Sequence, residues 1–430
     1  MNINSKLVAD GHDVRLNLFL GLANWSIFLD HIPHDVVNQI TARNYGFSGA
    51  ADLFIFISGY TAAIACAGIT LERGFIIGAT RIVKQLGQLY AAYIVLFVSY
   101  IVLITHVAAQ YSVPDIINEF NIAGLIDQPV NILGHGLLLQ AKPLNLDVLQ
   151  LYILLTACLV LVSWLLMRAP DLTMVGSIVL YLAARWFGWN LSSFPDGYWY
   201  FNPFCWQLLF VFGAWLALGG AKRFSRLLKS SLLLYAGIAY LVFALAMTLA
   251  GRFPDVAQVF PAWLADAFNP IDKVNLAPYR VLHFVAVAFV FTRLVPKNSP
   301  TLKSPIFRPL VKCGEQSLAV FCVGVFLSFI GHFALTLSAG SLADQFLVSI
   351  AGIATMTFVA YYLSWSRQQD VWKTLAPADD RQTGAISARL KTDWRLEHDP
   401  DPKGRVSAKW TPLFPRDKGE TRLRGDHAQN

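Results

Sequence analysis

Long apolar runs separated by short polar segments make up most of this chain of 430 residues. An apolar run of about 20 residues is long enough to cross a bilayer as a helix, and such runs recur up to about residue 365. Strands of a membrane barrel would instead alternate apolar and polar residues over about ten positions. The pattern therefore predicts an all-α, polytopic membrane helix bundle of about ten transmembrane helices. The predicted spans are residues 16–33, 49–71, 86–105, 148–167, 173–190, 203–219, 231–250, 279–295, 313–336 and 344–365.

The basic residues between these spans predict the orientation of the chain. One set of short connections carries thirteen Lys and Arg residues, and the opposite set carries six over much longer segments. Lys and Arg are enriched in cytoplasmic loops. We therefore expect both termini to be cytoplasmic and the Lys/Arg-poor loops to be periplasmic.

The pattern changes after the last predicted span. Residues 366–430 contain thirteen Lys or Arg and ten Asp or Glu, with several prolines and little periodic apolar pattern. Such a composition cannot bury enough apolar surface to fold on its own. The sequence thus predicts two parts, a membrane domain over residues 1–365 and a mostly disordered, basic cytoplasmic tail over residues 366–430.

Composition narrows the functional classes. Hydrophobic residues make up 55% of the chain and charged residues 14%, whereas soluble domains contain about 25% charged residues. The net charge of +7 follows from the basic loops and the tail, so it does not indicate nucleic-acid binding. The five cysteines form no CxxC pair, and no metal site is expected. A P-loop, an HExxH motif and a GxSxG motif are absent, which argues against ATP-driven transport, metallopeptidase and serine hydrolase chemistry.

Several polar side chains lie at the ends of the spans that are predicted to face the periplasm. A charged side chain inside a membrane is costly, so it usually faces a cavity or a partner. These residues come from distant parts of the chain and yet share one depth, which predicts a functional site there. They are Asp30, His31, Arg43, Asn44, Asp52, Trp206, Lys273, Asn275, Arg280 and His283.

His31 is the candidate general base. An imidazole can accept and return a proton near neutral pH, and it could take the proton of a hydroxyl that attacks a carbonyl. Asp52, at the same predicted depth, could orient the ring. Asp30 is the poorer partner because adjacent residues of a helix point in different directions. The alternative is an ordinary histidine at a helix end among lipid headgroups.

Two further groups suggest substrate binding. Lys273, Arg280 and His283, with Asn275, could hold a carboxylate or a phosphate; the alternative is snorkelling of basic side chains at a helix end. Ten aromatic residues between positions 185 and 207 could stack on sugar rings. An interfacial aromatic belt would have the same composition.

Five blocks of this sequence resemble the OpgC family, which belongs to a superfamily of polytopic membrane acyltransferases. They are "FLDHIP", "RNYGFSGAADLFIFISGYTAA", "NPFCWQLLFVFGA", "DKVNLAPYRVLHF" and "CGEQSLAVFCVGVFLSF". The blocks occur in the order of the family, and the resemblance extends from about residue 13 to residue 365.

The resemblance implies an inner-membrane O-acyltransferase that transfers succinyl from succinyl-CoA to hydroxyls of periplasmic glucans. It maps His31 onto the catalytic histidine and Asp52 onto an acidic position of the family. It implies an acyl-CoA co-substrate without a tightly bound cofactor, and as partners a glucan acceptor, membrane lipid and glucan-synthesis proteins. In one respect the chain departs from the family: Leu20 stands where the first span usually carries an arginine, eleven residues before the histidine.

Two other functions use the same residues. In a transporter of a carboxylate or a sugar, the ionisable side chains would form the binding site, although such sites usually lie near the bilayer midplane. In a non-catalytic subunit of a glucan-export complex, His31 could be replaced without loss of function.

Overall fold

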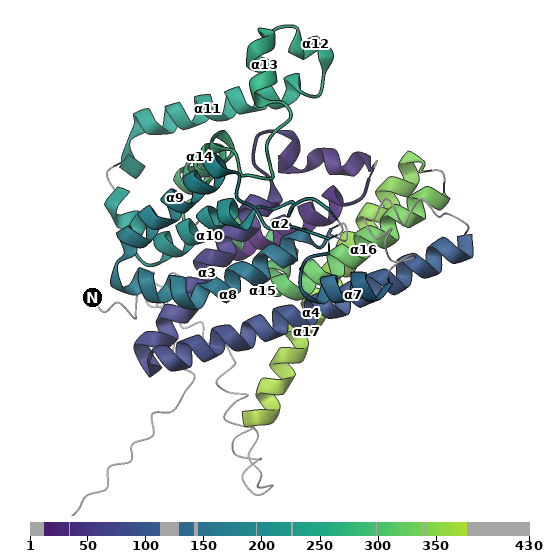
Figure 1. Cartoon of the computed structure of the whole chain (residues 1–430), viewed down its shortest axis with the longest axis horizontal. Coiled ribbons are helices and arrows are strands. Elements are labelled where there is room, and N and C mark those ends of the chain that lie inside the picture. The colour runs from purple at the N-terminus through teal and green to yellow at the C-terminus, as the bar shows by residue number, and fades with distance from the viewer. Residues whose placement is uncertain are drawn as a thin grey trace, which may run out of the picture. The chain divides into compact units, whose positions relative to one another are not determined.

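A computed structural model describes residues 13–33, 35–111, 129–141, 145–194, 196–224, 227–297, 299–338 and 340–375 (Figure 1). Within these ranges the regular elements are helices, apart from isolated β-bridges between Ala141 and Phe194 and between Ser192 and Tyr198. The predicted helical class is therefore confirmed. Most of the predicted tail, residues 376–430, lies outside the described residues.

Ten α-helices of fifteen or more residues form the framework: α2 (Val14–Asp30), α3 (Ala50–Arg73), α4 (Phe75–Tyr111), α8 (Asp147–Arg168), α9 (Pro170–Phe187), α10 (Pro203–Ala217), α11 (Ser231–Ala250), α14 (Pro278–Leu294), α16 (Ser317–Leu337) and α17 (Leu342–Leu375). Shorter helices are α7 (Pro129–Leu137), α12 (Pro254–Ala257), α13 (Ala262–Phe268) and α15 (Arg308–Glu315). The 3₁₀ segments are Val36–Ile40, Ala42–Asn44, Gly220–Phe224, Leu227–Lys229, Pro300–Lys303 and Pro305–Phe307.

Each predicted span overlaps one of the ten long helices. Six helices in the described ranges are long and apolar enough to cross a membrane: Ala50–Arg73, Phe75–Val107, Asp147–Arg168, Ser231–Ala250, Ser317–Leu337 and Leu342–Gln369. The chain is thus a multi-pass membrane protein by length and composition of its helices, while ten crossings and cytoplasmic termini stay predictions. The ninth predicted span is interrupted at Gln316, between α15 and α16.

Polar caps and prolines determine where several helices begin. Asp13 caps α2 by accepting a hydrogen bond from the backbone N–H of Arg15, and Asn202 caps α10 in the same way through Phe204. Proline occupies the first position of α10 and α14, where its missing N–H has no cost. The loops before α10 and α14 contribute residues to the candidate site, and the positions at which these two helices begin determine where those loops end.

Glycines allow the closest helix contacts of the bundle. A side chain on Gly59 of α3 would collide with the backbone carbonyl of Phe210, and one on Gly213 of α10 would collide with that of Phe56. Gly21 of α2 and Gly314 of α15 make the same reciprocal approach to each other's helices. Small residues at such crossings let the backbones of membrane helices pack directly. The two crossings hold α2 and α3, the helices that flank the candidate site, in fixed positions.

The contacts along the chain divide it into two units, Met1–Arg367 and Gln368–Asn430. The first contains the helices from α2 to α16 and most of α17. Of the second unit the structure describes residues 368–375, the last turns of α17.

We predict that Gly59→Leu destabilises the protein and that Gly68→Leu does not. Both glycines lie on α3, but a side chain at Gly68 would meet open space. Overpacking of a close contact typically costs about 1–3 kcal/mol, and the obstacle at Gly59 is backbone that cannot move aside. The measurement is the thermal unfolding midpoint of each purified variant in one detergent. Equal midpoints for the two variants would contradict the proposed role of the crossing.

Candidate active site

A cavity of about 680 Å³ lies where the C-terminal end of α2, the N-terminal end of α8 and the loops before α10 and α14 meet. This volume is within the usual range of small-molecule sites. The lining combines charged, amide and aromatic side chains: Asp30, His31, Ile32, Pro33, Asn38, Arg43, Asn145, Asp147, Val148, Tyr198, Trp199, Tyr200, Phe201, Lys273 and Val274. Four of the ten predicted site residues, namely Asp30, His31, Arg43 and Lys273, therefore share one cavity.

His31 follows the last residue of α2 and ends that helix. Its backbone N–H donates to the carbonyls of Ile27 and Phe28, at 3.1 and 3.3 Å. Among the described residues, the buried Nδ1 of its ring has no hydrogen-bond partner. The ring lines the cavity and lies within electrostatic range of Lys273 and Arg43. An imidazole with a nitrogen unoccupied by the protein is suited to exchange a proton with a bound molecule.

The segment after α2 is held in place by its own polar side chains. Thr41 Oγ1 donates to Asp30 Oδ1 at 2.6 Å, and Arg43 Nε lies 3.5 Å from the same oxygen. Asn44 Nδ2 donates to the carbonyl of Asn38 at 2.7 Å. Asp30 and Asn44 thus brace the loop that brings the guanidinium of Arg43 to the cavity.

Lys273 enters the cavity from the opposite side, on the loop before α14. Trp206 Nε1 donates to the Lys273 carbonyl at 3.1 Å, and the Asn202 backbone N–H donates to the Val274 carbonyl at 3.1 Å. Asn202 Nδ2 also donates to Asn275 Oδ1 at 2.9 Å. Trp206 and Asn275 therefore lie outside the cavity wall and hold the backbone that carries Lys273.

The surroundings of Lys273 act on its charge in two directions. The ammonium lies 5.2 Å from the ring centres of both Tyr200 and Phe201, and such ring faces favour the charged form. Burial lowers the pKa of Lys273 to about 8, and the nearby Arg280 guanidinium acts in the same direction. Because the pKa is close to neutral pH, the charge of this side chain can change in the physiological range.

Asp52 and Arg280 form a buried ion pair with each other. Arg280 Nε donates to Asp52 Oδ1 at 2.9 Å, and Arg280 Nη2 contacts Asp52 Oδ2. Asp52 Oδ2 also accepts from the Gly49 backbone N–H at 2.8 Å, while Arg280 Nη1 donates to the Phe47 carbonyl at 2.7 Å. The carboxylate is fully buried. The sequence predicts that Asp52 orients His31, but its hydrogen bonds go to Arg280 and Gly49, and neither of these residues lines the cavity.

His283 is also paired inside the protein. Its Nδ1 lies 2.7 Å from Ser48 Oγ, and both residues are buried. Neither His283 nor Arg280 lines the cavity. The three residues predicted to form a cationic patch are therefore divided. Lys273 lines the cavity, whereas Arg280 and His283 do not. In the cavity, the second cation is Arg43.

The predicted aromatic segment is divided as well. Tyr198, Trp199, Tyr200 and Phe201 line the cavity, whereas the Trp186 side chain is 85% exposed on α9. The four lining residues are the part of the segment that can meet a sugar ring. The exposed remainder has the character of a membrane-interface belt.

Three polar residues of the cavity were missing from the sequence prediction: Asn38, Asn145 and Asp147. Asn145 and Asp147 come directly before the fourth predicted span, at the depth of the other candidates. The rule that found Asp30 and Lys273 would have found them too, had it been applied to every span end. Asp147 is the second carboxylate in the lining of the cavity, in addition to Asp30.

Leu20 stands where the first span of the family usually carries an arginine, and its surroundings in the structure are apolar. Leu20 is buried in the main hydrophobic core between α2 and its neighbours. Arg15, one turn earlier, donates to the Asp13 carboxylate and, from Nη1, to the Val295 carbonyl at 2.9 Å. Arg15 therefore does not supply a cation at the position of Leu20.

Comparison with known proteins gives one family. The family model described as "OpgC protein" matches residues 12–368, which include α2 to α16 and every residue of the cavity. No curated protein and no solved structure matches the chain. The family indicates a membrane enzyme of the acyltransferase type. The match covers most of the 430 residues, so the chain belongs to the OpgC family.

Proposed function

We propose that this protein is a membrane O-acyltransferase and that the cavity around His31 is its active site. The observation that carries the proposal is the convergence of an imidazole, two cations and four aromatic residues in one cavity at the ends of the helices. An acyl transfer to a hydroxyl needs a base, a positive charge near the carbonyl and a surface for the acceptor. The cavity offers each of these from a different segment of the chain.

In the proposed reaction, His31 takes the proton from an acceptor hydroxyl as its oxygen attacks the thioester carbonyl of the donor. Negative charge then develops on the carbonyl oxygen, and Lys273 or Arg43 stabilises it. The C–S bond breaks as the intermediate collapses to the ester. The imidazolium returns its proton to the thiolate, which leaves as a free thiol, and His31 is ready for the next turnover.

We infer that the donor is succinyl-CoA and the acceptor a periplasmic glucan, as the resemblance to the family implies. The free carboxylate of a succinyl group would pair with whichever of Lys273 and Arg43 does not face the reacting carbonyl. The Tyr198–Phe201 segment supplies ring faces for a sugar, and Asn145 and Asp147 supply hydrogen-bond partners for its hydroxyls. The proposal gives no contact with a substrate to Asp52, Arg280 or His283. Their role is to hold the protein structure around the site through their buried hydrogen bonds.

The first prediction is that His31→Ala abolishes glucan acylation. A general base contributes about 10²–10⁴-fold in rate, so the rate in membranes with succinyl-CoA and glucan should fall by at least two orders of magnitude. The measurement is the succinyl mass increment on the glucan. His106→Ala is the matched control, because His106 is exposed on α4 and does not line the cavity.

Retained acylation by a folded His31→Ala variant would remove His31 from the mechanism. Uptake of the substrate into vesicles without any covalent change would instead favour a transporter. A non-catalytic subunit would be favoured if neither the wild-type protein nor the His31→Ala variant transferred an acyl group and both supported normal glucan export.

A second prediction concerns pH. The pKa of Lys273 is lowered to about 8, and the charged groups acting on it are Asp30, Arg43, Asp52 and Arg280. If the ammonium binds the donor's carboxylate, the affinity for succinyl-CoA is full below pH 7 and declines as pH rises through 8. In Lys273→Arg this decline should disappear, because an arginine stays protonated over the whole range.

The measurement is the Kd of succinyl-CoA between pH 6.5 and 9, with acetyl-CoA as the donor that lacks a carboxylate. Lys273→Met should weaken binding of succinyl-CoA by about 10–100-fold, the usual range for a charged hydrogen bond of about 1.5–3 kcal/mol. The same loss for acetyl-CoA would contradict the role in recognising the carboxylate.

A third prediction separates support from catalysis at Asp52. Removing one member of a buried ion pair costs about 3–5 kcal/mol because the other charge remains unpaired. We therefore expect Asp52→Ala to lower the thermal unfolding midpoint strongly. A double variant, Asp52→Leu with Arg280→Leu, should recover much of this loss. Asp52→Asn with an unchanged midpoint and no acylation would show instead that Asp52 acts on the reaction.

A further inference from the structure

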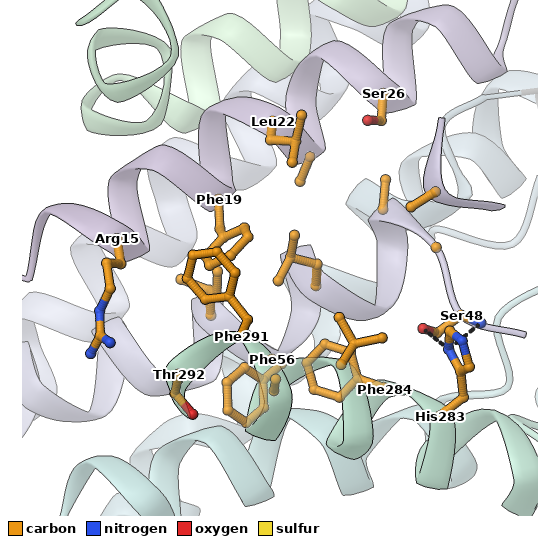
Figure 2. Close-up of a pocket in the computed structure, with 18 of the residues that line it drawn as sticks. Arg15, Phe19, Leu22, Ser26, Ser48, Phe56, His283, Phe284, Phe291 and Thr292 are labelled. Carbon is orange, nitrogen blue, oxygen red and sulfur yellow. Dashed lines mark hydrogen bonds between the residues drawn. The ribbon is translucent and has the colours of Figure 1, made fainter. Parts of the chain in front are cut away.

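A second cavity, of about 380 Å³, lies between α2, α3 and α14 and does not share lining residues with the His31 cavity (Figure 2). Its walls are almost entirely apolar. Phe19 and Leu22 come from α2, Phe56 from α3, and Phe284 and Phe291 from α14. We call this cavity the α2–α14 groove.

The groove is long and follows the helix axes. Its lining residues on α2 extend from Arg15 to Ser26 and those on α14 from Thr292 back to His283. At 1.5 Å per residue, the α2 wall alone is about 16 Å long. Figure 2 shows Arg15, Phe19, Leu22 and Ser26 spaced along α2 in this order. A ligand that fills the groove is therefore elongated and lies along the helices.

Among the described residues, the groove offers no unpaired charge to such a ligand. At one end Arg15 is bound to Asp13 and to the Val295 carbonyl. At the other end Ser48 and His283 are hydrogen-bonded to each other (Figure 2). Between them the wall is formed by aromatic and aliphatic groups, and Phe19 and Phe291 are in edge contact with centres 4.4 Å apart. Chemistry of this kind recognises a hydrocarbon chain.

The groove is also accessible from the side of the bundle. Leu22 and Val287 line it, and their side chains are 42% and 40% exposed. These residues lie on α2 and α14, the helices of the first and eighth predicted spans. On helices that cross a membrane, the medium that meets exposed leucine and valine is the hydrocarbon of the bilayer. A chain can thus enter laterally without crossing an aqueous phase.

We propose that the α2–α14 groove binds the acyl chain of a bilayer lipid. Lipid tails are as apolar as leucine, so transfer from the bilayer into the groove gains little hydrophobic energy. The gain comes from dispersion contacts that an empty groove would forgo. Water is a poor occupant, because it would find few polar partners along the wall. The bound chain completes the packing between α2 and α14, independently of the reaction at His31.

The test uses the full-length protein in lipid nanodiscs that contain phosphatidylglycerol with a photoreactive diazirine in one acyl chain. After illumination, mass spectrometry should locate labels on α2 and α14 beside Phe19 and Phe291. Ala288→Trp fills the groove and should lower this labelling at least about tenfold, which corresponds to about 1.4 kcal/mol. Leu282→Trp is the matched control, since Leu282 is an exposed residue of α14 outside the groove.

Leu22→Trp at the side opening provides a second blocking variant in case Ala288→Trp does not fold. Labels confined to other exposed helix faces would overturn the proposal. So would equal groove labelling in the two α14 variants. Loss of groove labelling on addition of succinyl-CoA would also overturn it, because the occupant would then be the donor's thioester arm. None of these outcomes depends on whether His31 catalyses acyl transfer.

Discussion

The buried contact between Asp52 and Arg280 holds together the parts of the protein that form the candidate active site. It joins the first turn of α3 to the first turn of α14, and these helices follow the loops that carry Arg43 and Lys273. Arg280 binds the Phe47 carbonyl at the same time, so a single guanidinium on α14 holds both the first turn of α3 and the loop before it. With Asp52 fully buried, neither charge can be removed without leaving the other uncompensated. The positions of the two cavity cations therefore depend on a pair that does not enter the cavity.

The sequence was sufficient to predict that several polar side chains lie close together at the ends of the spans. The reason is that burying a charge in a membrane is costly, and this cost applies to every span. The same rule brought Asp30, His31, Arg43 and Lys273 together from separate segments, and the structure has all four in one cavity. The helical class followed from run length alone. The interruption at Gln316 was not predicted, although the sequence there, Gly314-Glu315-Gln316-Ser317, is polar and the apolar run begins only at Leu318.

The partners of the charged residues could not be predicted in the same way. A common predicted depth in the membrane indicates that Asp52, His31 and Arg280 lie in one layer. Which of these side chains form an ion pair or a hydrogen bond depends on which helices are adjacent. α3 packs closely on α10 through Gly59 and Gly213, and Asp52 in the first turn of α3 pairs with Arg280 of α14. The sequence does contain the glycines, but a glycine in a span does not reveal which helix it faces.

Leu20 lies on α2, the helix that contributes residues to both of the cavities described above. In the structure it belongs to the buried core on α2, so the middle of this helix presents no cation to either side. Arg15 cannot compensate, because its guanidinium is bound to Asp13 and Val295 at the far end of the α2–α14 groove. The phosphates of the proposed donor would accordingly pair with cations on other elements. This donor carries charge and the acyl chain of a lipid does not, so the two proposed ligands suit different cavities. The apolar middle of α2 is compatible with the proposed hydrocarbon occupant of the groove, and Arg43 and Lys273 are the cations that line the cavity at His31.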